Sequence, residues 1–307
     1  MFLFELRYGV FLMVHNIMTE ILYSIIIPHY NLPLLLTKLL DSIPRSKEFE
    51  VIVVDDKSDK YLEEYAACKQ KYSESNIRFY DNDSEKKSAG ACRNIGLIHA
   101  TGKWILFADA DDFFIENFFD IMLKEKDREE DVIFFFPTSI NIDSGEMADR
   151  HIEFSNILNA YLEEPTEENE LVLRFHMVTP CCKMIRHSLI TDNNIVFGTS
   201  KVANDVLFCR QLGVYADKIA VVRKEIYVIT LREGSITYIM DSDQFLERTQ
   251  VFVDSTVFVR NHVTPERYKK IGYNGRYLLH ILRVNHLGMR AFWNMVWMFW
   301  KNGIRIW

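Results

Sequence analysis

The residues best suited to chemistry in this sequence are Asp109 and Asp111, which follow an apolar run at 104–108. Five consecutive apolar residues predict a buried strand, and open α/β sheets bind ligands at the carboxyl ends of their strands. Side chains two residues apart point the same way if the backbone stays extended. Such a carboxylate pair suits a hard divalent cation that shares oxygen ligands with a substrate phosphate. The alternative is a solvated acidic turn that closes the strand.

A second acidic pair, Asp55-Asp56, follows the apolar run at 51–54. In a parallel sheet both acidic sets would lie on the same edge. Carboxylates gathered there repel one another, and a metal–diphosphate or a ribose and base between them would relieve the repulsion. The sequence has neither a Walker loop nor a Gly-x-Gly-x-x-Gly after the first strand. Side chains and a cation, rather than a glycine cradle, would therefore hold a nucleotide.

Alternating apolar patterns predict the elements that must position these carboxylates. Strands are predicted at 23–27, 51–54, 77–80, 104–108 and 132–136, and helices at 33–40, 61–72, 88–100 and 115–126. Strands alternating with helices of this length imply a mostly parallel, doubly wound sheet. Further on, we expect an irregular polar segment at 138–165, a helix at 201–212, a strand pair around 220–230 and a helical end from Asp241.

Composition and charge exclude several classes of protein. The 307 residues are 49% apolar, which allows a sizeable core, and carry a net charge of −7. An acidic body argues against nucleic acid as a partner. The five cysteines lack C-x-x-C spacing, which indicates neither a disulfide framework nor a zinc site and predicts reduced thiols in a cytoplasmic protein. No stretch approaches the ~20 apolar residues that a membrane span needs.

Four segments together resemble a family 2 glycosyltransferase of the GT-A fold, of the type that builds bacterial surface polysaccharides. They read SIIIPHYN at 24–31, VVDDKS at 53–58, GACRNIG at 90–96 and LFADADD at 106–112. The similarity continues through KMIR at 183–186, NIVF at 194–197, NDVLF at 204–208 and REGSI at 232–236, and it covers roughly residues 21–240. It implies an α/β fold with a Rossmann-like, mostly parallel sheet and flanking helices, followed by a C-terminal helical extension.

The resemblance implies roles for residues around the nucleobase. Pro28 and Tyr30 would line the base pocket, with Tyr30 stacked on the base. Tyr30 has the alternative of a half-buried aromatic at a strand end. Asp56 would accept a hydrogen bond from the base, and Asp55 would help to shape the loop.

The resemblance also implies roles near the phosphates. Arg93 would offset the negative charge of the site, with a surface salt bridge as the alternative. Asp109 would bind the ribose hydroxyls or, through water, the metal, and Asp111 would ligate Mn²⁺ or Mg²⁺ directly. Arg232 and Ser235 match a loop that can fold over the diphosphate.

An inverting transfer needs a carboxylate that takes the proton of the acceptor hydroxyl. The family usually supplies it from a Glu-Asp pair at a helix start, which here reads Asn204-Asp205. The resemblance therefore implies Asp205 as the base, with Asp192 and Glu233 as second choices. Asn204 departs from the family pattern, and a simple helix cap is the alternative for Asp205.

Together these roles imply a metal-dependent, inverting glycosyltransferase that moves a sugar from a nucleoside-diphosphate sugar, expected to be a UDP-sugar, to a glycan or lipid-linked acceptor hydroxyl. A sugar-phosphate nucleotidyltransferase is one alternative, although the sequence lacks its glycine-rich basic loop after the first strand. A non-catalytic nucleotide-sugar-binding scaffold is the other, and only Asn204 favours it. The expected parts are an N-terminal extension 1–20, within which Met18 is an alternative start, a nucleotide-sugar-binding half 21–137, an acceptor-binding half 138–240 and a helical extension 241–307.

The last segment, 276–307, combines five basic residues and four tryptophans with no acid. Its aromatic run at 291–300 is too short to span a bilayer, but tryptophans between Arg290 and Lys301 suit the plane of an anionic membrane surface. A helix packed on the catalytic body, or on a second subunit of a homodimer, is an equal alternative. The expected location is cytoplasmic, with peripheral contact at the inner face of the cell membrane.

Overall fold

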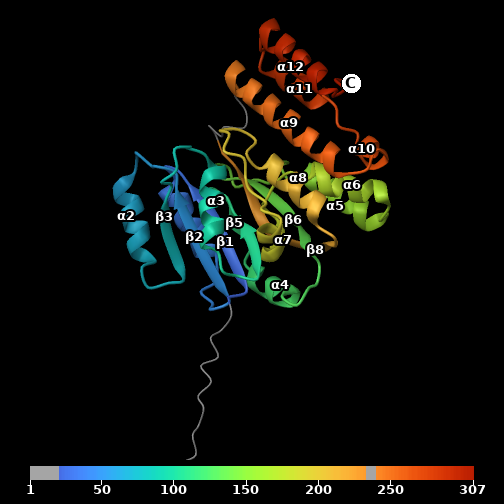
Figure 1. Ribbon diagram of the computed structural model, residues 1–307. Helices are drawn as coiled ribbons and strands as arrows, with labels where there is room; N and C mark the ends of the chain where they lie inside the picture. Colours follow the sequence, from blue (N-terminus) through green and yellow to red (C-terminus); the bar gives the residue numbers. More distant parts are fainter. Residues whose placement is uncertain (1–20, 233–239) are drawn as a thin grey trace, which may run out of the picture.

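The structure of the protein is a computed structural model that describes residues 21–232 and 240–307 (Figure 1). Within these residues eight strands form one sheet in the order β3-β2-β1-β4-β7-β6-β8-β5. The strands are β1 (Tyr23–His29), β2 (Phe49–Asp55), β3 (Ile77–Asp81), β4 (Trp104–Phe107), β5 (Phe113–Phe114), β6 (Val132–Asn141), β7 (Lys183–Arg186) and β8 (Ile219–Leu231). The helices of the sheet-forming part are α1 (Pro33–Ser42), α2 (Leu62–Lys71), α3 (Ala89–His99), α4 (Phe118–Glu125), α5 (Ile152–Glu163), α6 (Glu167–His176), α7 (His187–Asp192) and α8 (Val206–Tyr215).

The first four long strands confirm the predicted parallel arrangement. β1 is parallel to both β2 and β4, and β2 is parallel to β3. Every residue of β1, β2 and β4 is buried, which explains the unbroken apolar runs at 25–28 in β1, 51–54 in β2 and 104–107 in β4. Because parallel strands share an edge for their carboxyl ends, Asp55 at the end of β2 and Asp109 just after β4 lie on the same side of the sheet.

The second half of the sheet is mixed. β7 is antiparallel to both β4 and β6, and β6 is parallel to β8. One hydrophobic core extends from Tyr23 in β1 to Tyr227 in β8, so the two halves of the sheet share a core. Residue 137, the expected end of the first half, lies inside β6.

Two predictions for this second half are wrong. The segment predicted to be irregular contains the end of β6 and helix α5, whose Leu158 is fully buried. The predicted strand pair is the single strand β8. The charged residues 223–225 in the middle of β8 have the polarity of a turn, which explains the prediction of two strands. They are exposed because β5 pairs with β8 only at Tyr227 and Val228 and leaves this edge open.

The predicted helical extension is confirmed. It comprises α9 (Ser242–His262), α10 (Pro265–Ile271), α11 (Arg276–Val284) and α12 (Met289–Asn302), which lie together at one end of the molecule (Figure 1). Asp241 and Gln244 form a capping box that starts α9, and Thr264 caps α10. The extension has its own core, which includes Phe245 and Phe299. Within the described ranges, no helix is both long and apolar enough to cross a membrane.

A buried arginine fastens the extension to the sheet-forming part. Arg210, on α8, donates from Nη1 to Ser255 Oγ at 2.6 Å and to Thr256 Oγ1 at 2.9 Å, both on α9. Its guanidinium carbon lies 4.1 Å from the ring centre of Tyr273, and burial lowers the pKa of the group. We call this set of contacts the Arg210 staple. It joins the helix that follows Asp205 directly to the longest helix of the extension.

Candidate active site

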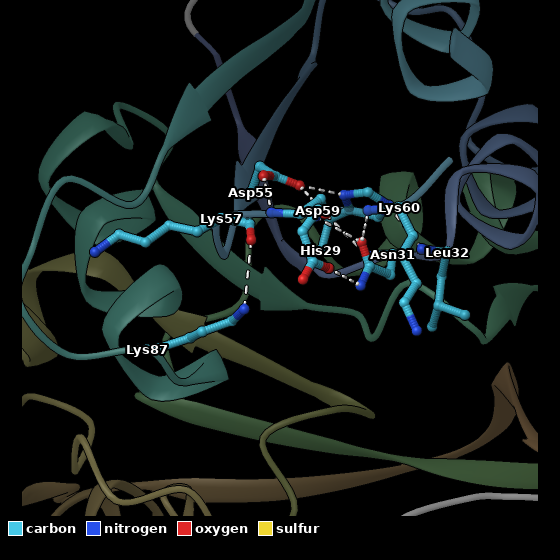
Figure 2. A network of polar contacts seen from close by, with 9 residues as sticks. His29, Asn31, Leu32, Asp55, Lys57, Asp59, Lys60 and Lys87 are labelled. Carbon is cyan, nitrogen blue, oxygen red and sulfur yellow. Dashed lines mark hydrogen bonds and ion pairs between the residues drawn. The ribbon is translucent and has the colours of Figure 1, made fainter. Parts of the chain in front are cut away.

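The loop after β2 is shaped by a buried carboxylate, Asp55. His29 Nδ1 lies 2.7 Å from Asp55 Oδ1, and Ser58 donates to the same carboxylate from its hydroxyl at 2.6 Å and its amide at 2.8 Å. Leu32 N donates to His29 Nε2 at 3.1 Å, so Nδ1 carries the proton of a neutral ring (Figure 2). Burial would raise the pKa of Asp55, but the hydrogen bonds from His29 and Ser58 outweigh it and lower that pKa.

Tyr30 and its neighbours form the outer part of this loop. Pro28 is buried in β1, whereas Tyr30 is 41% exposed and has Lys87 Nζ 3.9 Å from its ring centre. Asn31 accepts from the amides of Asp59 at 3.0 Å and Lys60 at 2.9 Å, and donates to Asp59 Oδ1 at 2.7 Å (Figure 2). The loop is thus held by side chain to backbone bonds and leaves the Tyr30 ring partly open to solvent.

Asp56, the other carboxylate of the pair, is also buried. Its amide donates to His29 O at 2.7 Å, and Asn82 Nδ2 donates to its Oδ1 at 2.6 Å. Sequence reasoning missed both His29 and Asn82. Asn82 had a signal, because it follows β3 as Asp55-Asp56 follow β2.

Arg93, on α3, lies between the two halves of the site. Its Nη2 donates to Asp109 Oδ1 at 2.6 Å, and its Nη1 donates to Asn204 Oδ1 at 2.9 Å. The salt bridge considered from the sequence is present, but it is not a pair between two surface side chains, because Arg93 is 6% exposed and Asp109 41%. Burial alone would lower the pKa of Arg93, but the charge of Asp109 outweighs it and raises that pKa. One buried cation therefore joins the end of β4 to the segment that precedes α8.

Close backbone packing fixes the distance that Arg93 spans. A Cβ on Gly90 would lie 1.9 Å from the carbonyl oxygen of Gly198, so only glycine fits there. Asn94 donates to Phe197 O at 3.0 Å and accepts from Phe197 N at 2.8 Å. The start of α3 is thereby fastened to the segment that leads toward Asn204.

The acidic segment after β4 is a turn, not extended backbone. Asp112 N donates to Asp109 O at 3.0 Å, so the geometry assumed for Asp109 and Asp111 from the sequence is wrong. The reason is that the chain leaves β4 after Phe107 and pairs with β8 from Phe113 onward, so the residues between them change direction. The buried carboxylate of Asp112 accepts from Thr230 N at 2.7 Å and braces this turn against β8.

The turn places the carboxyl group of Asp111 among charged neighbours. Burial and the neighbouring charge of Asp109 raise the pKa of Asp111, against the opposing effect of Arg232. Arg232 Nε donates to Asp111 Oδ2 at 3.2 Å. In the part of the chain that the structure describes, no group of three or more His, Cys, Asp or Glu side chains could hold a metal ion. A cation at Asp109 and Asp111 would need further oxygens from a substrate.

Asp205 occupies the N-cap position of α8, but its side chain makes no capping hydrogen bond. The helix-cap alternative is therefore wrong. Burial of the carboxyl group raises the pKa of Asp205, while the charge of Arg93 opposes that shift. Asp192 lies exposed at the end of α7, and Thr191 is its side-chain partner. The remaining candidates of the sequence, Glu233 and Ser235, lie outside the described residues.

Comparison with known proteins gives the same family as the sequence motifs. The profile of the family described as Glycosyl transferase family 2 matches residues 24–192, more than half of the chain. The chain is 29% identical over 232 residues to the poly(ribitol-phosphate) beta-N-acetylglucosaminyltransferase TarS of Staphylococcus aureus. That match covers 72% of this chain and 38% of TarS, so the chain spans well under half of this relative.

Solved structures agree on the fold. The crystal structure of S. aureus TarS 1–349 in complex with UDP-GlcNAc matches with a TM-score of 0.65 at 24% identity, covering 85% of this chain and 73% of that one. The mannosyltransferase PcManGT of Pyrobaculum calidifontis, in complex with GDP-Man and Mn²⁺, matches with a TM-score of 0.56 at 18% identity, covering 92% and 74%. The resemblance drawn from the four motifs is confirmed: the chain belongs to glycosyl transferase family 2 and has the GT-A fold.

Proposed function

We propose that this chain is an inverting glycosyltransferase that moves a sugar from a UDP-sugar to a hydroxyl of a glycan or lipid-linked acceptor. The observation that carries the proposal is the position of Arg93. It holds Asp109 at 2.6 Å and Asn204 at 2.9 Å, which brings the donor-side carboxylate and the neighbour of Asp205 to one guanidinium. The TarS 1–349 complex with UDP-GlcNAc supports a UDP-sugar as donor.

Asp56 and Tyr30 are the proposed contacts of the nucleobase. Both oxygens of Asp55 are engaged by His29 and Ser58, whereas Asn82 bonds to one oxygen of Asp56, Oδ1, so Asp56 is the better acceptor for a hydrogen bond from the base. The ring of Tyr30 is partly exposed, which leaves area for stacking on a base. The ammonium group of Lys87 lies over the same ring.

Asp109 and Asp111 are the proposed ligands of Mn²⁺ or Mg²⁺. Their carboxylates fit such a cation because hard divalent cations take oxygen ligands and because the two negative charges disfavour each other without one. When bound, the cation would offset the negative charge of the departing nucleoside diphosphate. Arg232, which donates to Asp111 at 3.2 Å, would contact the same diphosphate.

Asp205 is the proposed base. The acceptor oxygen attacks the anomeric carbon while the bond from that carbon to the diphosphate oxygen breaks, which inverts the configuration. Asp205 takes the proton of the acceptor hydroxyl, and its raised pKa brings the carboxylate closer to the operating pH of a general base. Asn204 anchors this segment to Arg93 as a neutral acceptor and adds no charge beside the base.

Donor turnover without an acceptor tests this proposal. The full chain would be incubated with UDP-GlcNAc, UDP-glucose, UDP-galactose and GDP-mannose, each with Mn²⁺ or with EDTA. We expect slow release of UDP by hydrolysis from one UDP-sugar, and loss of that release in EDTA. The anomeric configuration of the released sugar, followed by NMR, should be opposite to that of the donor.

Two results would contradict the proposal. Formation of a nucleotide-sugar and pyrophosphate from UTP and a sugar phosphate would indicate a nucleotidyltransferase. Saturable binding of a UDP-sugar, seen as an increase in melting temperature with no UDP release, would indicate a binding scaffold.

A further inference from the structure

Helix α12 has two apolar faces, and only one of them is covered. Ala291, Met295 and Phe299 are buried in the core of the extension. On the other side, Trp293, Trp297 and Trp300 are 60%, 57% and 78% exposed. Their spacing of four and three residues places these tryptophans on one face of the helix. With the exposed Met289, four residues before Trp293 on the same helix, they form what we call the tryptophan face.

Basic side chains surround the tryptophan face. Arg290 and Lys301 flank it on α12, and Lys301 Nζ lies 5.1 Å from the ring centre of Trp297. On α11, Arg276 and Arg283 are exposed two turns apart. Among the described residues, none of these four has a carboxylate within ion-pair distance.

The charge of the whole extension agrees with this local pattern. Residues 241–307 contain ten Lys or Arg and five Asp or Glu, whereas the chain as a whole carries −7. Basic charge is therefore concentrated in the part of the molecule that carries the exposed tryptophans.

We propose that the tryptophan face is a peripheral binding site for the surface of an anionic lipid bilayer. Trp has an apolar ring and a polar N–H, so it favours the boundary between headgroups and acyl chains, and Lys and Arg beside it would pair with anionic headgroups. A second copy of the chain fits less well, because a two-fold contact would bring the same unpaired cations together. The proposal does not depend on the glycosyl-transfer reaction, since lipid binding requires no turnover.

Lipid binding can be measured with the tryptophans themselves. The full chain would be mixed with vesicles of phosphatidylcholine alone, or of phosphatidylcholine with phosphatidylglycerol. We expect cosedimentation only with the anionic vesicles, and less of it as salt screens the charges. Brominated acyl chains should quench Trp293, Trp297 and Trp300, while Trp104, which is fully buried in the sheet, remains as an unquenched reference.

A pair of matched variants tests the apolar part of the site. Trp293→Ser with Trp297→Ser should weaken vesicle binding by more than about tenfold, because two interfacial rings are lost. Leu34→Ser with Ile98→Ser is the control, since these side chains on the other part of the molecule are 74% and 79% exposed. Circular dichroism should show unchanged folding for both. Equal binding by the two double variants would overturn the proposal.

A second pair tests the charges. Arg290→Gln with Lys301→Gln should weaken binding to anionic vesicles by about 30-fold, whereas Lys124→Gln with Lys224→Gln should not. Absence of wild-type binding to either vesicle would overturn the proposal. So would a concentration-dependent dimer, seen by light scattering, that the tryptophan variant abolishes, because it would assign the face to a second copy.

Discussion

Charge is used in opposite ways in the candidate active site and in the helical extension. In the site, Arg93 and Asp55 are buried and each is held by two partners. In the extension, Arg283 and Arg290 are exposed and no described carboxylate pairs with them. A buried charged group with short hydrogen bonds holds its partner side chains in fixed positions. An exposed charge without a partner instead attracts oppositely charged molecules from solution. Substitutions of the same type should therefore have unequal effects in the two regions.

The largest difference should be seen for the proposed base. Asp205→Asn should lower the transfer rate by roughly 10²–10⁴-fold, because an amide cannot take the acceptor proton, and donor affinity should stay unchanged. Asp254→Asn, on the exposed side of α9, should leave the rate unchanged. Initial rates and donor titrations of both variants would measure this. A near wild-type rate for Asp205→Asn would place the base elsewhere.

The next difference concerns stability. Arg93→Met should lower the free energy of unfolding by about 3 kcal/mol, because it leaves Asp109 and Asn204 without their shared donor. Arg283→Met, on α11, should change it by no more than about 0.5 kcal/mol. Urea unfolding of both variants would compare them. Similar midpoints would mean that the buried and exposed arginines do not differ as described.

A smaller effect is expected for the proposed metal ligand. Asp111→Asn should weaken Mn²⁺-dependent binding of UDP by about 10–100-fold while the fold stays intact. Asp243→Asn, in the first turn of α9, should not alter it. Calorimetric titration of UDP with and without Mn²⁺ would give both values. If UDP affinity in Mn²⁺ is the same for Asp111→Asn and the wild type, this carboxylate does not ligate the cation.

The smallest effect should depend on pH. Asp55 has a folded-state pKa below its unfolded value, so it contributes stability above the unfolded pKa of about 3.9, and this is lost as pH falls through the folded pKa. Asp55→Asn should therefore lower the free energy of unfolding by about 1.5 kcal/mol at pH 7. The difference in the free energy of unfolding between Asp55→Asn and the wild type should become smaller below about pH 4. A gap that stays constant across this range would contradict the role of ionised Asp55.

The parallel half of the fold was predictable because its signals are local. β1, β2 and β4 are buried along their whole length, and each contains a continuous run of four apolar residues. The second half was harder, because the exposed centre of β8 resembles a turn and depends on which strand covers that edge. The local sequence pattern predicts where strands and helices lie, but which strand pairs with an edge strand depends on the whole sheet.

The same distinction applies to the site. The sequence predicted that carboxylates would gather at one edge, because this follows from strand direction alone. It could not give the contact of His29 with Asp55, since these two residues are register partners of β1 and β2 and register is set by the assembled sheet. Nor could it give the turn from Asp109 to Asp112, which depends on β8 and its Thr230 amide.

The Arg210 staple has a consequence for how modular this protein is. Its guanidinium lies between α8 and α9 with hydroxyls as its hydrogen-bond partners on α9, and Leu171 and Phe175 on α6 share a core with Val259 on α9, so removal of α9 would break these bonds and expose apolar side chains to water. The helical extension is therefore not a detachable anchor that could be trimmed away or exchanged between related chains. A shorter version of the protein would need polar residues at positions 171 and 175, which the extension covers, to stay in solution.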